Sequence, residues 1–208
     1  CYLCTDTSLP YQRETLDLLG VSKDKVISLE TYALYQFKTV HVVAPDLLSP
    51  HSFKALQEFT SSLHAAIRAS ADGECKERLY ISRNDASGRR GVANEEEILP
   101  VLKNFGFKRI IMTGRPVAEQ ITLVRNAEYI VYPQGAACAH MLFCCPGTSF
   151  LELYSPRFID ATSVYISRAM GLKHHMVLGE KTPDSSIQAS FRINPSVLTN
   201  AMAHWCGS

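Results

Sequence analysis

The feature of this chain that most restricts its fold is a regular alternation of short apolar runs with amphipathic stretches of helical length. The apolar runs predict strands, which cover residues 2–5, 26–29, 39–44, 79–82, 109–112, 129–132, 149–153 and 174–178. The amphipathic stretches predict helices, which cover residues 10–19, 52–69, 95–105, 116–126, 137–143, 159–170 and 195–205. Because alternating strands and helices build parallel sheets with helices on both faces, we expect an α/β fold.

A polar segment over residues 71–77, with the sequence ADGECKE, divides this pattern into two parts. It follows a long amphipathic helix and contains Asp72 and Gly73, which is typical of a boundary between domains. We therefore expect two Rossmann-like units, an incomplete N-terminal one over residues 1–72 and a nearly complete C-terminal one over residues 73–208. In such folds a ligand binds in the crevice beyond the carboxyl ends of the strands.

The composition argues against three kinds of partner or site. With a formal net charge of +1 over 208 residues, the chain lacks the basic surface of a nucleic-acid-binding protein. No apolar run reaches the roughly 18 residues of a membrane-spanning helix, and the N-terminus lacks a signal-peptide layout, so we expect any anchoring segment outside this chain. The 7 cysteines lack the paired spacing of a zinc site, and they fit either a reducing cytoplasm or a partly disulfide-bonded lumen.

One segment has the layout of a phosphate-binding turn. The sequence EYIVYPQGAACAHMLF predicts a buried strand, a turn of small residues over Gln134 to Ala137, and a short helix. Small side chains at Gly135, Ala136 and Ala137 would leave the first N–H groups of the helix open to a ligand, and phosphate binds well at such a helix start. A glycine that only permits a tight turn would give the same pattern, so both interpretations stay open.

Two charged side chains accompany this turn. Arg83 directly follows the strand predicted over residues 79–82, where its planar guanidinium would hold two phosphate oxygens at once. Arg89 and Arg90, a few residues later, are interpreted as solvated surface charges. Glu152 lies inside an otherwise apolar strand, and a buried carboxylate needs a partner or a ligand. We expect Glu152 to accept hydrogen bonds from a ribose diol.

Other polar positions have structural interpretations. The run NEEE is typical of a helix start, because Asn94 is a good N-cap and Glu97 stands at the capping-box position. His140 is interpreted as a packed core residue, and His174 and His175 as one buried and one exposed strand residue. No residues have the spacing of a metal site, and no serine has the flanking pattern of a hydrolase nucleophile, so we expect neither.

Four segments, taken in order, resemble glycosyltransferase family 61: RLYISRNDASGRR, NEEEILPVLKNFGFKRI, AEQITLVRNAEYIVYPQGAACAHMLF and PGTSFLEL. The family pattern has a YISR-type strand with a following basic residue, an NE-E helix, the pair GF before the next strand, an EQ helix, a histidine-glycine-alanine turn, and a strand that ends in glutamate. The resemblance runs from Leu79 to Tyr154, and more loosely over earlier parts of the chain. Each motif alone is weak, but the set in this order and spacing is specific.

The resemblance implies a GT-B-type fold of two Rossmann-like units and an inverting glycosyltransferase. Such an enzyme transfers a sugar from a nucleotide-sugar donor, here expected to be a UDP-sugar, to a glycan or glycoprotein acceptor, usually without a metal ion or cofactor. By position, the resemblance places Arg83, the turn Gln134 to Ala137 and Glu152 in the donor site, supported by the NE-E and EQ helices. It implies the endoplasmic reticulum or Golgi lumen for a eukaryotic protein and the cytoplasm for a bacterial one.

The chain departs from the family pattern at the turn. Gln134 stands where the family usually has histidine, and Cys138 where it usually has glycine. A neutral amide can donate a hydrogen bond to a phosphate but cannot become cationic, so a catalytically lapsed nucleotide-sugar-binding protein is an alternative. An unrelated Rossmann-type enzyme is a third, against which the lack of a G-x-G-x-x-G turn argues. The resemblance implies a catalytic base from the facing domain, and Asp46 and His51, just beyond the strand predicted over residues 39–44, are the candidates, although each also fits an ordinary turn or helix cap.

Overall fold

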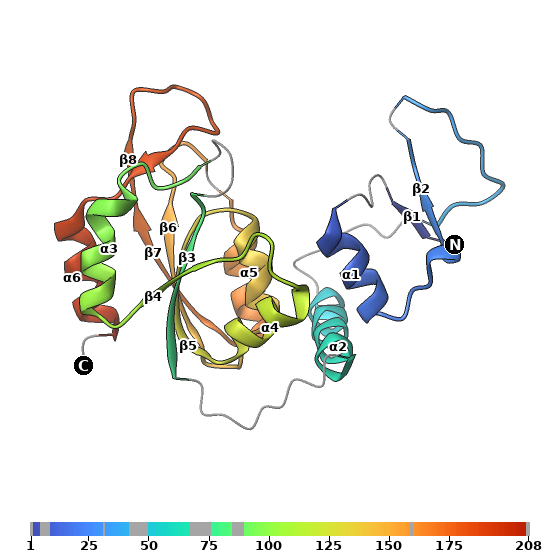
Figure 1. Ribbon diagram of the computed structural model, residues 1–208, viewed down its shortest axis with the longest axis horizontal. Coiled ribbons are helices and arrows are strands. Elements are labelled where there is room, and N and C mark those ends of the chain that lie inside the picture. The colour runs from blue at the N-terminus through green and yellow to red at the C-terminus, as the bar shows by residue number, and fades with distance from the viewer. Residues whose placement is uncertain are drawn as a thin grey trace.

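The structure, a computed structural model, describes residues 2–4, 9–30, 32–41, 50–66, 76–84, 90–158 and 160–206. Its central element is a five-stranded sheet in the order β4-β3-β5-β6-β7, in which every neighbouring pair is parallel (Figure 1). The strands are β3 (Glu77–Ser82), β4 (Lys108–Ile111), β5 (Ala127–Pro133), β6 (Ser149–Tyr154) and β7 (Lys173–Leu178). The predicted α/β class with a parallel central sheet is therefore confirmed.

Helices cover both faces of this sheet, as Figure 1 shows. On one face lie α3 (Glu95–Asn104) and α6 (Pro195–Cys206), and on the other lie α4 (Val117–Arg125), the 3₁₀-helix η2 (Ala136–Phe143) and α5 (Thr162–Met170). Successive residues of a strand point to opposite faces, so Val131 of β5 joins the core under α6 while Ile130 and Tyr132 join the core under η2 and α5. Each face of the sheet thus has its own apolar core.

The order of the strands reverses between β3 and β5. After β3 the chain first adds β4 on one side of it and then returns to add β5 on the other side. In open parallel sheets a ligand site forms at such a switch point, because the loops that leave the two carboxyl ends turn away from each other. Arg83 follows β3 and Gln134 follows β5, so the two predicted segments lie at this switch point.

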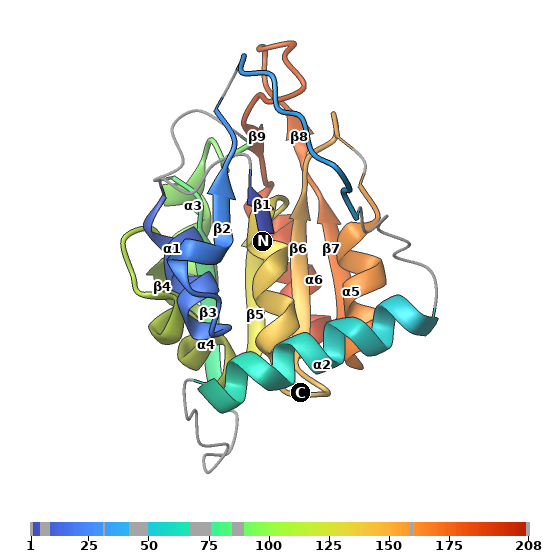
Figure 2. The ribbon, with the colours of Figure 1, turned by 90° about the vertical axis from the view of Figure 1, so that its right-hand side faces the viewer.

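The N-terminal part is smaller and has its own sheet, in which β1 (Tyr2–Cys4) and β2 (Val26–Ser28) pair in parallel. Between them lie α1 (Pro10–Leu18) and the 3₁₀-helix η1 (Lys23–Lys25), and α2 (Pro50–Ala66) follows. Helix α2 packs across α5 and η2 (Figure 2), where Nε2 of Gln57 donates a hydrogen bond to the backbone oxygen of Ala169 at 2.9 Å. A β-α-β unit is only part of a Rossmann-like unit. The N-terminal Rossmann-like unit, and its boundary near residue 72, therefore stay predictions.

Local details differ from the predictions. Residues 39–41 of the strand predicted over residues 39–44 are not in a strand, and the rest of it lies outside the described residues. The antiparallel pair β8 (Glu180–Lys181) and β9 (Phe191–Arg192) was not predicted, because such short strands carry no periodic pattern. The helix predicted over residues 137–143 is a 3₁₀-helix. Within the part of the chain that the structure describes, no helix has the length and apolarity to cross a membrane.

Candidate functional site

Arg83 and Gly135 meet at the switch point between β3 and β5. Nη1 of Arg83 donates a hydrogen bond to the backbone oxygen of Gln134 at 2.9 Å. A Cβ atom on Gly135 would lie 1.4 Å from the same Nη1, so the guanidinium fills the space that any side chain would take. Gly135 also has φ 149° and ψ −160°, a region that glycine alone adopts without strain. The structure thus brings the predicted arginine and the predicted turn together.

Gln134 ties this turn to the loop after β6. Its backbone N–H donates to the oxygen of Leu153 at 2.9 Å, and its side-chain Oε1 accepts from the backbone N–H of Ser155 at 3.3 Å. The side chain is buried, and no described residue accepts a hydrogen bond from its Nε2. Ala136, which begins η2, is exposed, so a ligand can reach the first turn of that helix. Because η2 is a 3₁₀-helix, its N–H groups are less well aligned than those of the expected helix.

Glu152 is enclosed by the protein on the face of the sheet that η2 and α5 cover. Its side chain is 1% exposed, Oγ of Ser163 donates to Oε1 at 3.1 Å, and Nε2 of His174 donates to Oε2 at 3.1 Å. The Tyr132 hydroxyl joins this group through Ser163 at 3.0 Å, and burial together with the charge of Glu152 raises the pKa of Tyr132. The partners that a buried carboxylate requires are therefore present, and the ribose contact stays a prediction.

Glu152→Gln should lower the free energy of unfolding by about 1 to 3 kcal/mol, because an amide N–H₂ would face a group that is itself a donor. Urea denaturation measures this, with Glu180→Gln in the exposed strand β8 as the control. The ribose contact would appear separately, as weaker binding of UDP with unchanged binding of pyrophosphate. Wild-type stability of Glu152→Gln would contradict the structural role.

The acidic run at the start of α3 does more than begin a helix. Asn94 stands at the N-cap position as predicted, but its side chain makes no capping hydrogen bond. Its Nδ2 instead donates to the Glu97 side chain at 2.9 Å and to the backbone oxygen of Ile193 at 2.8 Å. Its Oδ1 accepts from the backbone N–H of Ile193 at 2.9 Å. The side chain therefore joins α3 to the segment before α6. Asn94 and Arg192 lower the pKa of Glu97 by hydrogen bonding to its carboxylate.

Glu95, part of the run NEEE that was interpreted as a helix start, is buried and belongs to a polar network beside Arg83. Its side chain is 1% exposed, and Oε2 accepts from Nη2 of Arg109 at 2.6 Å and from Nδ2 of Asn84 at 2.7 Å. Oε1 accepts a short hydrogen bond from Oγ of Ser82. Ser82 and Asn84 flank Arg83 in sequence, so this network fixes the backbone on both sides of the candidate ligand-binding arginine.

Two further arginines lie at the same edge of the sheet. Arg90, expected to be a solvated charge, is instead half-buried, and its guanidinium lies 4.3 Å from the centroid of the Phe158 ring. Arg157 donates from Nη2 to the backbone oxygen of Thr182 at 2.9 Å. Arg90 belongs to the loop after β3 and Arg157 to the loop after β6, so both add positive charge on the side where Arg83 lies. Arg89 lies outside the described residues.

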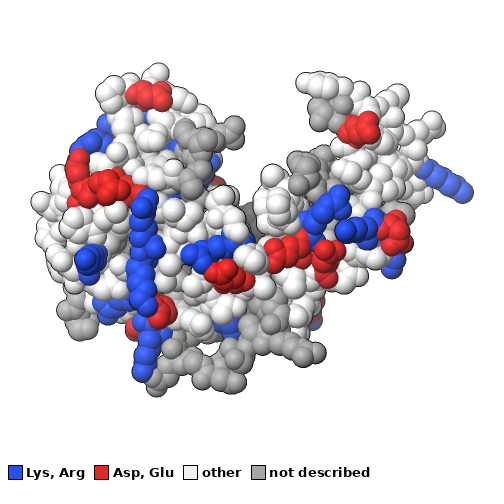
Figure 3. Space-filling model, viewed as in Figure 1, with Lys and Arg blue, Asp and Glu red and all other residues white. Residues whose placement is uncertain are grey.

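The surface is hollowed between the lobe of the large sheet and the lobe that contains β1, α1 and β2 (Figure 3). Basic and acidic side chains are interspersed over this face, and the view shows no broad basic patch. This mixture agrees with a formal net charge of +1.

The remaining candidates divide into described and undescribed residues. Asp46 lies outside the described residues, and so does the side chain of His51, whose backbone belongs to α2. His140, predicted to be a core residue, is partly buried, with Nε2 at 2.9 Å from Oε1 of Gln120, and burial lowers its pKa. Among the described residues, no three His, Cys, Asp or Glu side chains come together as a metal site.

Comparison with known proteins gives a family match that covers most of these segments. The model of the family described as Glycosyltransferase 61 matches residues 7–151. This range includes Arg83 and the turn from Gln134 to Ala137, and it ends one residue before Glu152. Among curated proteins, none matches the chain.

Proposed function

Because the chain belongs to glycosyltransferase family 61, we propose that it is an inverting enzyme that transfers a sugar from a UDP-sugar to a glycan or glycoprotein. Membership of the family implies glycosyltransferase activity, and hence a sugar donor and an acceptor. The UDP donor, the inverting course and the GT-B arrangement of two units are parts of the proposal. The observation that carries it is the contact between Arg83 and Gly135 at the switch point of the sheet.

The leaving group makes the main demand on such a site. As the bond between the anomeric carbon and UDP breaks, UDP departs with the bonding electron pair, and negative charge builds on its diphosphate. Arg83 is a fixed cation beside the turn, and the N–H groups at the start of η2 offer hydrogen bonds to phosphate oxygens. Ala136 carries only an exposed methyl group there, so a phosphate group can approach the backbone. In this scheme no metal ion is required.

Inversion requires the acceptor hydroxyl oxygen to attack the anomeric carbon from the face opposite UDP, while a base removes the hydroxyl proton. In a GT-B arrangement that face points toward the N-terminal unit, so we place the base there, with Asp46 and His51 as the candidates. Glu95 and Glu152 are unsuited to this role, since both are buried and hydrogen-bonded within the C-terminal part.

Arg83→Ala should weaken UDP binding by about 10- to 150-fold, because a hydrogen bond to a charged group contributes about 1.5 to 3 kcal/mol. Calorimetric titration with UDP measures this, and Arg168→Ala, at an exposed position in the last turn of α5, is the control. An unchanged affinity would remove Arg83 from the donor site.

The same titration with EDTA tests metal independence, which would be wrong if chelation abolished UDP binding and Mn²⁺ restored it.

Gln134 favours one alternative, a nucleotide-sugar-binding protein without transferase activity. Its amide cannot become cationic, so it offers the departing diphosphate less stabilisation than a protonated histidine would. Assays of transfer and hydrolysis with UDP, GDP and CMP sugars separate the two functions. Binding of UDP without turnover of any donor would identify the binding protein.

A further inference from the structure

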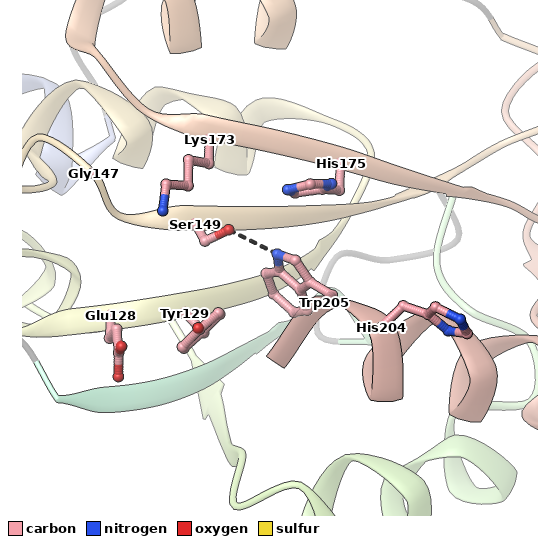
Figure 4. A pocket seen from close by; sticks show the side chains of 8 residues that line it. All are labelled: Glu128, Tyr129, Gly147, Ser149, Lys173, His175, His204 and Trp205. Atoms are coloured by element: carbon pink, nitrogen blue, oxygen red, sulfur yellow. Dashed lines mark hydrogen bonds between the residues drawn. The ribbon is translucent and has the colours of Figure 1, made fainter. Parts of the chain in front are cut away.

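A pocket of about 270 Å³ opens at the amino ends of β5, β6 and β7, beside the last turn of α6 (Figure 4). Arg83 and Gly135 lie at the carboxyl ends of their strands, so this pocket is on the opposite edge of the sheet. Its wall contains a row of cross-strand neighbours, in which Tyr129 pairs with Ser149, and Ser149 pairs with Lys173. Neighbours in register share one face of the sheet, so these side chains lie together.

Trp205 forms a fixed aromatic surface in this pocket. Its Nε1 donates to Oγ of Ser149 at 2.7 Å, and its ring stacks on Phe107 with the centroids 5.9 Å apart. Tyr129 meets it edge to face at 5.1 Å, and the His175 ring lies 6.2 Å away. Figure 4 shows the indole between Tyr129 on β5 and His175 on β7. Because these contacts hold the ring before any ligand arrives, binding against it costs little side-chain entropy.

The charged groups of the pocket balance each other. Lys173 brings one positive charge and Glu128 one negative charge, and both side chains line the pocket. Partial burial lowers the pKa of His175, and the neighbouring His174 and Lys173 lower it further. The pocket therefore offers both hydrogen-bond donors and acceptors without selecting an ion of either sign.

We propose that this pocket binds a neutral pyranose ring of a glycan. The C–H face of the ring lies against Trp205, and its hydroxyl groups form hydrogen bonds with Lys173 and Glu128. Sugar hydroxyls both donate and accept, which suits a pocket with one cation and one anion. The volume of about 270 Å³ falls below the roughly 300 to 1,000 Å³ of sites for drug-sized ligands, which fits a single ring rather than a nucleotide sugar. In a glycosyltransferase, such a site would hold carbohydrate at a distance from the donor crevice.

The chain has 1 tryptophan, Trp205, so tryptophan fluorescence reports on this pocket alone. Titration with the methyl glycosides of glucose, galactose, mannose, xylose and N-acetylglucosamine should give a saturable change for at least one sugar. Glu128→Ala and Lys173→Ala should each weaken this binding about tenfold or more, because each removes a charged hydrogen-bonding group. Lys181→Ala, in the exposed strand β8, should leave it unchanged, and so should Arg83→Ala.

Saturation-transfer NMR on the same sugars provides a second measurement that does not depend on a change in fluorescence. The proposal is overturned if no sugar gives a signal by either method, or if binding is the same in Glu128→Ala and Lys173→Ala as in the wild type. Binding of glucuronic acid or inorganic phosphate in place of the neutral sugars would make the pocket an anion site instead. Loss of sugar binding in Arg83→Ala would place the sugar in the donor crevice. Circular dichroism checks that each variant is folded.

Discussion

Replacing Gly135 by alanine should weaken UDP binding by about 100-fold or more, a loss of about 3 kcal/mol. The new Cβ atom would stand 1.4 Å from Nη1 and 2.6 Å from Cζ of Arg83, so the guanidinium would have to leave the crevice. Its hydrogen bond to the backbone oxygen of Gln134 would be lost at the same time. The backbone conformation of Gly135 adds about 1 to 3 kcal/mol of strain for any residue with a side chain, so the free energy of unfolding should also fall.

Gly114→Ala separates the two effects. Gly114 also has a positive φ, of 80°, but no atom lies within 4 Å of the position that its Cβ would take. This variant therefore carries backbone strain without a clash, and it should bind UDP like the wild type. Calorimetric titration and thermal unfolding of both variants give the comparison. Wild-type UDP affinity in Gly135→Ala would mean that the observed position of Arg83 has no part in donor binding.

Most of the elements could be predicted because each is specified by its own residues. β6 is an unbroken run of buried residues, which is typical of a strand covered on both faces, and the prediction over residues 149–153 matches it closely. The order of the strands is not a local property. Nothing within β3 indicates that β4 lies on one side of it and β5 on the other, yet that arrangement creates the switch point.

The candidate site was predictable to the same extent. Arg83 and Gln134 each follow a strand, and the carboxyl ends of parallel strands share one edge, so both were expected near one crevice. Their direct contact depends on β3 and β5 being neighbours, which only the structure shows. Glu95 was missed because a helix start already accounts for the run NEEE. Its partner Arg109 lies on β4, and only the order of the strands in the sheet brings β4 beside β3.

Glu95→Ala should lower the free energy of unfolding by about 3 kcal/mol, because breaking a buried ion pair leaves its partner uncompensated. The Glu95 side chain is 1% exposed but that of Arg109 is 37% exposed. Water can therefore reach the arginine, which sets the expected loss at the lower end of the range for buried pairs. Glu96→Ala is the matched control, since Glu96 is the next residue in the same turn and is exposed. Urea denaturation of both variants measures the difference.

Glu95→Gln tests whether this network also positions Arg83. The amide keeps the shape of the side chain and one acceptor oxygen, but it removes the charge that holds Arg109. The acceptors for Ser82 and Asn84 would be partly lost, and these two residues fix the backbone on either side of Arg83. UDP affinity should therefore fall by about tenfold in folded Glu95→Gln, with Glu96→Gln unchanged. If the free energy of unfolding falls but UDP affinity does not, Glu95 supports the fold without orienting Arg83. A shift of the carboxyl end of β3 would move Arg83 and would therefore change UDP affinity.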